Sequence, residues 1–498
     1  LGPALVAVPA TALALTTAVL FSGVAVALFG LLLRSRTGAV LEGFITASIL
    51  VLAAQGWWLA VAFGAAGDLS WAETLQRALP SGWGVVAVEA AERSDWLVVA
   101  AMLFLSCALL GVLLTAWATL IGRRITNPRG RLLALPTGRH RSMATGGGRR
   151  GAVVAKELRA WSRDPMRINL LSFALFYGLL YCLLPVPAGW TGMLPYASAI
   201  TVTMAAAVSA NLYGVDGTAL WLTLITPGAE KEDIRGRQAA WLLTVAPAAA
   251  LLTVVATALS GQSAAWPWML TLLPALLGGG AGLVALLSVV VLVPGTDPHK
   301  RGGNPLSFGD DDGAQVGSVF LMLLLVPLTA LPAAAVVLAG VLLDQPLVAW
   351  AGVPTGIATG VLFAWLLGDI AHRRLRARGP ELLALMRHGP APAGSGVAAG
   401  EGKLPKMPLV QTIVVYLCWW LCWLPLFPQG IVPLVFKLIG PPVRSWFLAL
   451  YLPPVWQWPV IVAMIALGLA MLAAAIMIPR RYERTDAEPH QVPDAALR

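Results

Sequence analysis

The chain has 498 residues, of which 58% are hydrophobic and only 12% are charged, and its mean hydropathy is +0.78. Soluble globular proteins carry about 25% charged residues, so this composition excludes that class. Apolar runs of about 20 residues recur along the whole length, which is typical of a polytopic helical membrane protein. We therefore expect an all-α fold with about eleven transmembrane helices and amphipathic helices at the membrane surface.

Eleven apolar segments are predicted to span the bilayer. In chain order they are 3–33, 39–66, 96–122, 169–186, 193–213, 239–260, 266–293, 315–342, 346–371, 409–429 and 455–478. Only Glu42 and Asp369 are ionisable within them, each close to a membrane face, so coupling to protons or sodium ions is not indicated. The chain begins at Leu1 and its first span would enter from outside, so we expect an N-terminal part to be missing.

The net charge of +10 is distributed in a way that predicts orientation. Lys and Arg accumulate in cytoplasmic loops of membrane proteins, so the excess does not call for nucleic acid, and no nucleic-acid partner is expected. Four basic segments alternate consistently with eleven crossings if all are cytoplasmic. They are Arg34–Arg36, 123–168, the run HRRLRAR after Ile370 and the run PRRYER after the last span. The C-terminus is then cytoplasmic.

The outer loop LQRALPSGWGVVAVEAAERSDW (Leu75–Trp96) contains a candidate amphipathic helix. Its segment VVAVEAAE can place Val85 and Val88 on one face and the glutamates on another, hinged by a proline and the glycines of SGWG. A simple extracellular loop is the alternative. The candidate residues are Pro80, Trp83, Glu89 and Glu92.

The stretch AKELRAWSRDP (Ala155–Pro165) concentrates charge directly before an apolar run. A helix here would place three apolar side chains on one face and the cations largely away from it, as in a helix lying at the membrane surface. We expect that face to lie in the acyl chains, the helix to end before the proline, and Asn169 to cap the next span. A plain membrane anchor is the alternative. The candidate residues are Val154, Lys156, Glu157, Leu158, Arg159, Trp161, Arg163, Asp164 and Pro165.

The inside loop NLYGVDGTALWLTLITPGAEKEDIRGRQ (Asn211–Gln238) is divided by glycines and a proline. Its segment TALWLTLI is too short to span the membrane and too apolar to be exposed alone, so we expect a short helix that packs against the membrane or a partner. The candidate residues are Asp216, Gly217, Thr218, Leu220, Trp221, Leu222, Leu224 and Pro227.

Motifs for chemistry within this chain are missing from the sequence. There is no G-x-x-x-x-G-K-[ST] phosphate-binding loop, no H-E-x-x-H and no G-x-S-x-G. The five histidines form no cluster and the four cysteines fall within predicted spans, so no metal site is predicted. We expect no cofactor and no catalytic residue in this chain.

Three segments resemble those of the permease subunits of type-2 ATP-binding-cassette (ABC) exporters, in the long actinobacterial form. They are KELRAWSRDP before a span, NLYGVDGTALWLTLITP between later spans and LPSGWGVVAVEAA before an earlier span. The resemblance covers roughly residues 70–385. It implies six-span membrane units, each with an interface helix (here Val153–Asp164), a coupling helix that docks on the ATPase (Asp216–Thr226) and outer helices (Leu75–Asp95). The short segment Asp344–Pro346 departs from this pattern, because outer helices are expected there.

The resemblance implies a multi-pass protein of the bacterial cell membrane that moves an amphiphilic or lipid-like substrate outward. ATP and Mg²⁺ would bind to a separate cytoplasmic ATPase subunit, which acts as a dimer. Two readings from other classes remain open: a membrane-embedded enzyme acting on lipid-linked substrates, for which the outer-loop acids would be needed, and a non-transporting membrane scaffold.

The expected domain organisation follows from the spans and the resemblance. It comprises 1–128 (the last three spans of a first half), 129–151 (a linker), 152–388 (a six-span permease unit), 389–408 (a flexible linker), 409–480 (an appended two-span module) and 481–498 (a cytoplasmic tail).

Overall fold

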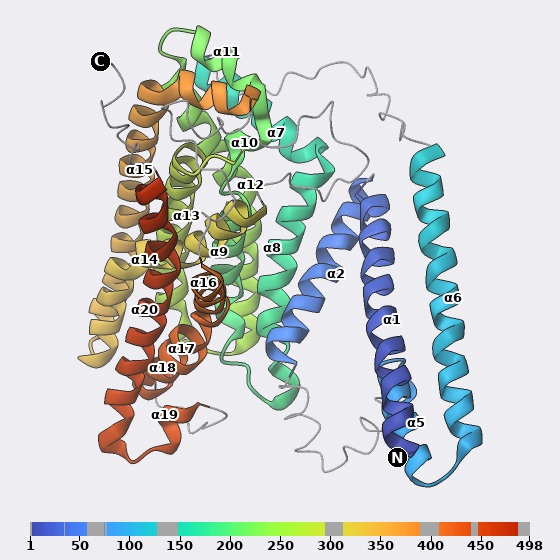
Figure 1. Ribbon diagram of the computed structural model, residues 1–498. Helices are drawn as coiled ribbons and strands as arrows, with labels where there is room; N and C mark the ends of the chain where they lie inside the picture. Colours follow the sequence, from blue (N-terminus) through green and yellow to red (C-terminus); the bar gives the residue numbers. More distant parts are fainter. Residues whose placement is uncertain are drawn as a thin grey trace, which may run out of the picture. The chain divides into compact units, whose positions relative to one another are not determined.

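The computed structural model describes residues 2–33, 35–56, 74, 77–126, 148–293, 312–388, 408–439 and 447–486. Over these residues the chain is helical without β-strands, and it is an all-α polytopic membrane protein. It divides into a large unit, Leu1–Ala399, and a small unit, Gly400–Arg498 (Figure 1). The predicted linkers 129–151 and 389–408 and the tail 481–498 lie mostly outside the described residues.

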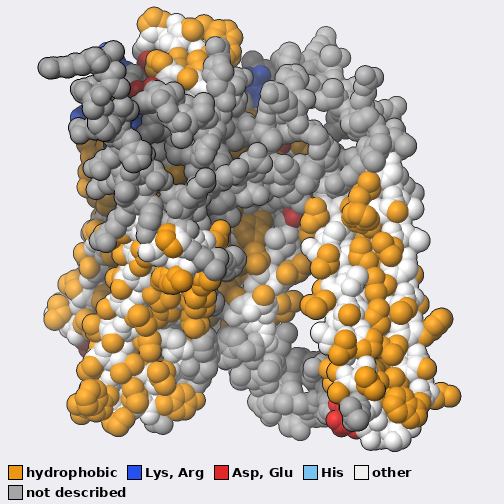
Figure 2. Space-filling view, in the orientation of Figure 1, with side chains coloured by type: hydrophobic (Ala, Val, Ile, Leu, Met, Phe, Trp, Pro, Cys, Tyr) orange, Lys and Arg blue, Asp and Glu red, His pale blue; other side chains and the backbone are white. Residues whose placement is uncertain are grey.

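Nine of the described helices are long and apolar enough to cross a membrane. They are α1 (Gly2–Leu32), α2 (Arg36–Gln55), α6 (Trp96–Thr126), α8 (Pro165–Leu183), α12 (Ala229–Ser260), α13 (Ala265–Val290), α14 (Asp312–Leu342), α15 (Pro346–His388) and α20 (Pro454–Asp486). Hydrophobic side chains cover much of the visible surface of these helices (Figure 2), with Leu97 81% and Leu347 86% exposed. Apolar exposure on this scale requires a lipid environment.

Two of the eleven predicted spans are interrupted. The segment 193–213 forms a 3₁₀ turn, η2 (Leu194–Tyr196), and α9 (Ala197–Val208), and the helix ends before Asn211. The segment 409–429 begins as α16 (Leu409–Leu421) and continues through α17 (Trp423–Leu426) into a π-helical turn, η4 (Phe427–Ile431). Pro425 and Pro428 lie in this region, and proline cannot donate the backbone hydrogen bond that a regular α-helix needs.

The core of the large unit is built around α13, which is mostly buried against α15, α14, α12 and α9. Trp241, Val202, Leu283 and Met322 belong to the same buried cluster. Small residues let the backbones approach closely. A Cβ atom at Gly278 of α13 would lie 2.1 Å from the carbonyl oxygen of Gly360 in α15, so this crossing has no room for a side chain.

Replacing Gly278 with Ala is therefore expected to destabilise the protein by about 3 kcal/mol, the upper end of the usual cost of overpacking, because backbone atoms must move. Gly111 of α6 is the control, since a Cβ atom there would meet nothing within 4 Å. Thermal unfolding in detergent should show a lower midpoint for Gly278→Ala and an unchanged or higher one for Gly111→Ala. Equal midpoints for the two variants would show that α13 and α15 are not in close contact.

Helices α1, α2, α5 and α6 precede this core in the chain. Helix α5 (Trp83–Glu92) packs with α1 and α6 through a cluster that includes Val6, Ala87 and Val99. Helix α2 packs along α8, where Gly43 lies against the α8 backbone at Asn169 and Phe173.

Helix α15 is longer than the predicted span 346–371, because it continues to His388. Its 43 residues are about twice the 20 or so that a bilayer crossing needs, and Figure 1 shows that the helix, which contains Pro380, bends near its C-terminal end and runs across the end of the large unit. Its last turns, including Arg373, Arg374, Arg376 and Arg378, therefore extend beyond the apolar part of the bundle.

The small unit packs α16, α17 and η4 against α20. Gly468 of α20 faces Leu426, and Gly430 faces Ile465. Helices α18 (Val432–Ile439) and α19 (Leu448–Tyr451) lie between η4 and α20 in the chain. Within this unit Lys437 donates a hydrogen bond to Gln457 and lies 5.6 Å from the centre of the Trp458 ring.

Candidate functional site: an ion-pair cluster beneath a projecting apolar helix

The charged stretch before α8 forms helix α7 (Arg149–Arg163), and the chain then turns directly into α8 at Pro165. Asp164 has extended backbone angles, and its side chain accepts a hydrogen bond from the backbone N–H of Met166 at 3.0 Å. Asp164 is therefore the N-cap of α8, and the prediction that Asn169 caps it is wrong. Asn169 is buried and donates to Glu42 and to the backbone carbonyl of Ala39 in α2.

The apolar face of α7 packs on protein, which differs from the expectation that it lies in acyl chains. Val154 and Trp161 are 7% and 5% exposed, and Trp161 belongs to the main core cluster. Helix α7 runs along α12, where a Cβ atom at Gly236 would lie 2.6 Å from Val153. Leu158 is only partly buried, while Arg159 and Arg163 are exposed as expected. The helix is amphipathic, and its apolar side meets α12, a contact that the sequence pattern does not specify.

This packing yields a testable difference between two tryptophans. Trp161→Ala is expected to destabilise the protein by about 3–5 kcal/mol, because it empties a core site and removes the ring beneath the Arg167 guanidinium, 5.2 Å away. Trp221→Ala is the matched control, because the Trp221 side chain is 42% exposed. Chemical or thermal unfolding in detergent measures both. A Trp161→Ala variant as stable as Trp221→Ala would place Trp161 in lipid instead.

The buried face of α7 also carries a carboxylate, Glu157, which is 1% exposed. It belongs to what we call the ion-pair cluster, six charged side chains from α7, α8, α12 and α10 (Leu212–Asp216). The cluster consists of Lys156, Glu157, Arg167, Asp216, Asp233 and Arg237. These six side chains carry three negative and three positive charges, and a fourth carboxylate, that of Asp164, lies 3.9 Å from Arg167.

Arg237 and Arg167 hold the cluster together. Arg237 contacts Asp216 at 2.6 Å, Asp233 at 2.9 Å and Glu157 at 3.2 Å. Arg167 contacts Glu157 at 2.8 Å and Asp216 at 2.9 Å. The side chains of Arg237 and Arg167 are only 3% and 6% exposed, so each of these contacts is made away from bulk water.

Two further contacts complete the site. Lys156, which is half-exposed, reaches Asp216 at 2.8 Å. Tyr213 of α10 donates its hydroxyl to Asp233, and its ring lies 4.2 Å from the Arg237 guanidinium. Asp216 thus forms ion pairs with cations from α7, α8 and α12, and these ion pairs hold the end of α10 against all three helices.

The carboxylates of Asp216 and Glu157 remain ionised despite their burial. Burial alone would raise the pKa of Asp216, but the attraction of Arg237, Lys156 and Arg167 outweighs it and holds that pKa below its ordinary value. The pKa of Glu157 is lowered in the same sense, chiefly by Arg237, against the opposing effect of burial. A buried network of this kind is stable only while every member is present.

Directly after Asp216 the chain turns outward into the predicted short helix. Gly217 has φ of 56° and Gly228 has φ of 71°, angles that favour glycine, and between them lie a 3₁₀ turn, η3 (Gly217–Ala219), and α11 (Leu220–Ile225). Arg149 of α7 donates to the carbonyl of Pro227 at 3.0 Å, which fixes the far end of this segment. The side chain of Thr218 lies outside the described residues.

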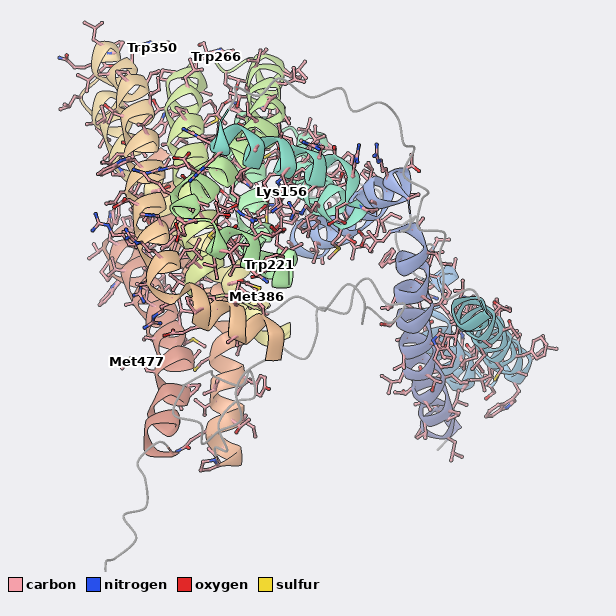
Figure 3. All side chains as sticks on the ribbon, turned by 90° about the horizontal axis from the view of Figure 1, so that it is seen from above. Lys156, Trp221, Trp266, Trp350, Met386 and Met477 are labelled. Atoms are coloured by element: carbon pink, nitrogen blue, oxygen red, sulfur yellow. The ribbon has the colours of Figure 1, made fainter. Side chains whose placement is uncertain are left out.

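Helix α11 has one buried side and one exposed side. Leu220 is 2% exposed and packs with Leu375 of α15, while Leu224 lies over Gly379. Trp221, Leu222 and Ile225 are 42%, 54% and 63% exposed. Figure 1 shows α11 at the extreme end of the large unit, and Figure 2 shows hydrophobic side chains there. From above, Trp221 lies near Met386 at the end of α15 (Figure 3).

Sequence reasoning placed Asp216 and Glu157 among the candidates but missed the partners that surround them. Arg167, Asp233, Arg237 and Tyr213 come from segments that were assigned to spans or to juxtamembrane charge. The segment EKEDIRGRQ does indicate part of the site. In a helix, Asp233 and Arg237 are four residues apart and share one face, so they can form an ion pair, and Gly236 lies beside them. The cation from Arg167 could not be placed without the tertiary structure.

The predicted outer helix forms as α5, although its buried face differs from the expected one. Ala87, Ala90 and Ala91 are buried, whereas Val85 is 56% exposed. Trp83 donates its ring N–H to the carbonyl of Ala78 across the turn that contains Pro80. Glu89 pairs with Arg77 at 3.1 Å and lies 3.9 Å from Arg93, and Glu92 is exposed.

Within the part of the chain that the structure describes, no group of three His, Cys, Asp or Glu side chains could hold a metal ion. Comparisons of the chain with family models, with curated proteins and with solved structures find no match.

Proposed function

We propose that the chain is the membrane permease subunit of an ABC exporter of the bacterial cell membrane, with α11 as the helix that docks on a separate cytoplasmic ATPase. The observation that carries the proposal is the arrangement at the end of the large unit. An exposed apolar helix projects there on a segment that is tied through Asp216 to α7, α8 and α12. Exposed apolar side chains in such a position favour a protein partner.

The geometry suits the transmission of force from a partner to the spans. Leu224 rests on α15 at Gly379, and Asp216 is held by Arg167 at the start of α8 and by Arg237 in α12. Movement of α11 would therefore be passed to three long helices instead of being absorbed by a loose loop. Transmission requires a rigid link, and α15, on which Leu224 rests, packs closely along α13.

The chain carries no phosphate-binding loop, so the proposal assigns ATP, Mg²⁺ and hydrolysis to the partner, which would act as a dimer. In this arrangement the end of the large unit that carries α11, α7 and the C-terminal turns of α15 is cytoplasmic, as is the C-terminus. The substrate moves outward and is amphiphilic or lipid-like, in keeping with spans that hold few charges.

The test first asks whether a reading frame beside that of this chain encodes a P-loop ATPase, and then co-expresses the two proteins. We expect the two proteins to purify together from detergent and the chain to change the rate of ATP hydrolysis by the ATPase. An ATPase that neither binds the chain nor responds to it in reconstituted vesicles would overturn the proposal.

A further inference from the structure

The cytoplasmic-side extension of α15 borders the exposed face of α11. Residues 371, 375 and 379 recur at intervals of four, and all three are buried. Leu375 and Gly379 form the stripe on which α11 rests through Leu220 and Leu224. The stripe is therefore covered by α11, and the side chains that flank it remain exposed.

Arg374 and Arg378 are four residues apart and lie on the same flank of this stripe, since each precedes one of its residues. Both are exposed, and the ion pair recorded for Arg378 among the described residues is a 4.0 Å contact with Glu381, in which both side chains are more than half exposed. Arg373, by contrast, lies on the far side of the helix and pairs with Asp369 at 2.7 Å. Arg376 is also exposed and follows Leu375 directly, so it lies on the opposite flank of the stripe. Cations therefore border the seat of α11 on both sides.

We propose, building on the proposed function, that α11 and the extension of α15 form one docking surface, and that the ATPase receives it in an apolar groove with an acidic rim. Leu222 and Ile225 enter the groove, and Arg374 and Arg378 face the rim. Charge at the rim of an interface steers association and makes it sensitive to salt, while the apolar centre supplies most of the affinity.

A protein is favoured over a lipid surface by the position of α11. Leu224 lies over Gly379, which is eight residues, or about 12 Å of helix, beyond the apolar segment of α15 that ends at residue 371. The headgroup region on one side of a bilayer is only about 5–8 Å thick, so α11 lies beyond it.

The experiment measures the affinity of the purified full chain for the P-loop ATPase that co-purifies with it, in an uncharged detergent and as a function of NaCl. The double variant Arg374→Gln, Arg378→Gln is expected to bind about five-fold more weakly at low salt. The difference should vanish at about 0.5 M NaCl, where charges are screened beyond about 4 Å. Arg373→Gln, the control on the far side of the same helix, should bind like the wild type.

The outcomes separate this inference from the proposed function. If Leu222→Asp abolishes binding while the double variant keeps wild-type affinity and salt dependence, α15 is not part of the surface but the proposed function stands. If neither variant alters binding, both fail. An effect of the double variant that appears only in vesicles with anionic lipid, and not in detergent, would assign the two arginines to lipid and overturn the inference.

Discussion

Replacing Arg237 with Met is expected to lower the free energy of unfolding by about 3–5 kcal/mol, the usual cost of breaking a buried ion pair from one side. The variant keeps most of the side-chain volume but leaves Asp216, Asp233 and Glu157 without their shared cation. The side chain of Arg237 is 3% exposed, so water cannot replace the lost contacts. The midpoint of thermal unfolding in detergent is the measurement.

Lys231 provides the control for this substitution. It lies on the same helix, less than two turns from Arg237, and is exposed, so Lys231→Met should change stability by no more than about 0.5 kcal/mol. If Arg237→Met were as stable as Lys231→Met, the ion-pair cluster would not hold α7, α10 and α12 together. Helix α11 would then have no rigid link to the spans through this cluster.

Replacing Leu222 with Asp is expected to separate binding from folding. The side chain is 54% exposed, so folding should be nearly unaffected. Charge at the centre of an apolar docking surface should weaken association with the ATPase by about 30-fold or more, since central contacts carry at least about 2 kcal/mol. Affinity for the ATPase and its stimulated hydrolysis rate are the two measurements.

Leu222→Met is the matched control, because it preserves the apolar character and approximate volume of the side chain. It should retain both affinity and stimulation. Two results would count against a docking role for α11: an Asp variant that binds normally, or a Met variant that fails as completely as the Asp variant.

The membrane character and most of the long helices could be predicted from the sequence because apolar length alone determines them. The short helix α11 was also predictable, since TALWLTLI is apolar but bounded by Gly217 and Pro227. Apolar length does not predict where a helix breaks, and so the interruptions at Asn211 and near Pro428 were missed. The extension of α15 was missed because its residues are charged, although they continue a helix whose apolar stripe includes Leu375.

The candidate site shows a different limit. The pattern around Trp161 indicates an amphipathic helix, but the same pattern suits a lipid surface or the side of another helix. Whether the apolar face of α7 packs on protein or on lipid depends on Gly236, which lets α12 approach, and on Arg167 and Arg237, which neutralise Glu157. Those three residues lie in other helices, so their role emerges only once the helices are packed.

The most direct test of the central claim replaces Trp221 with the photoreactive amino acid p-benzoylphenylalanine and irradiates living cells. Trp96, at the start of α6 and 56% exposed, takes the same replacement as the control. We expect an adduct at position 221 with a P-loop ATPase, identified by mass spectrometry, and none with that ATPase at position 96. Adducts at position 221 formed with lipid alone, or with a protein that lacks a P-loop, would contradict this expectation.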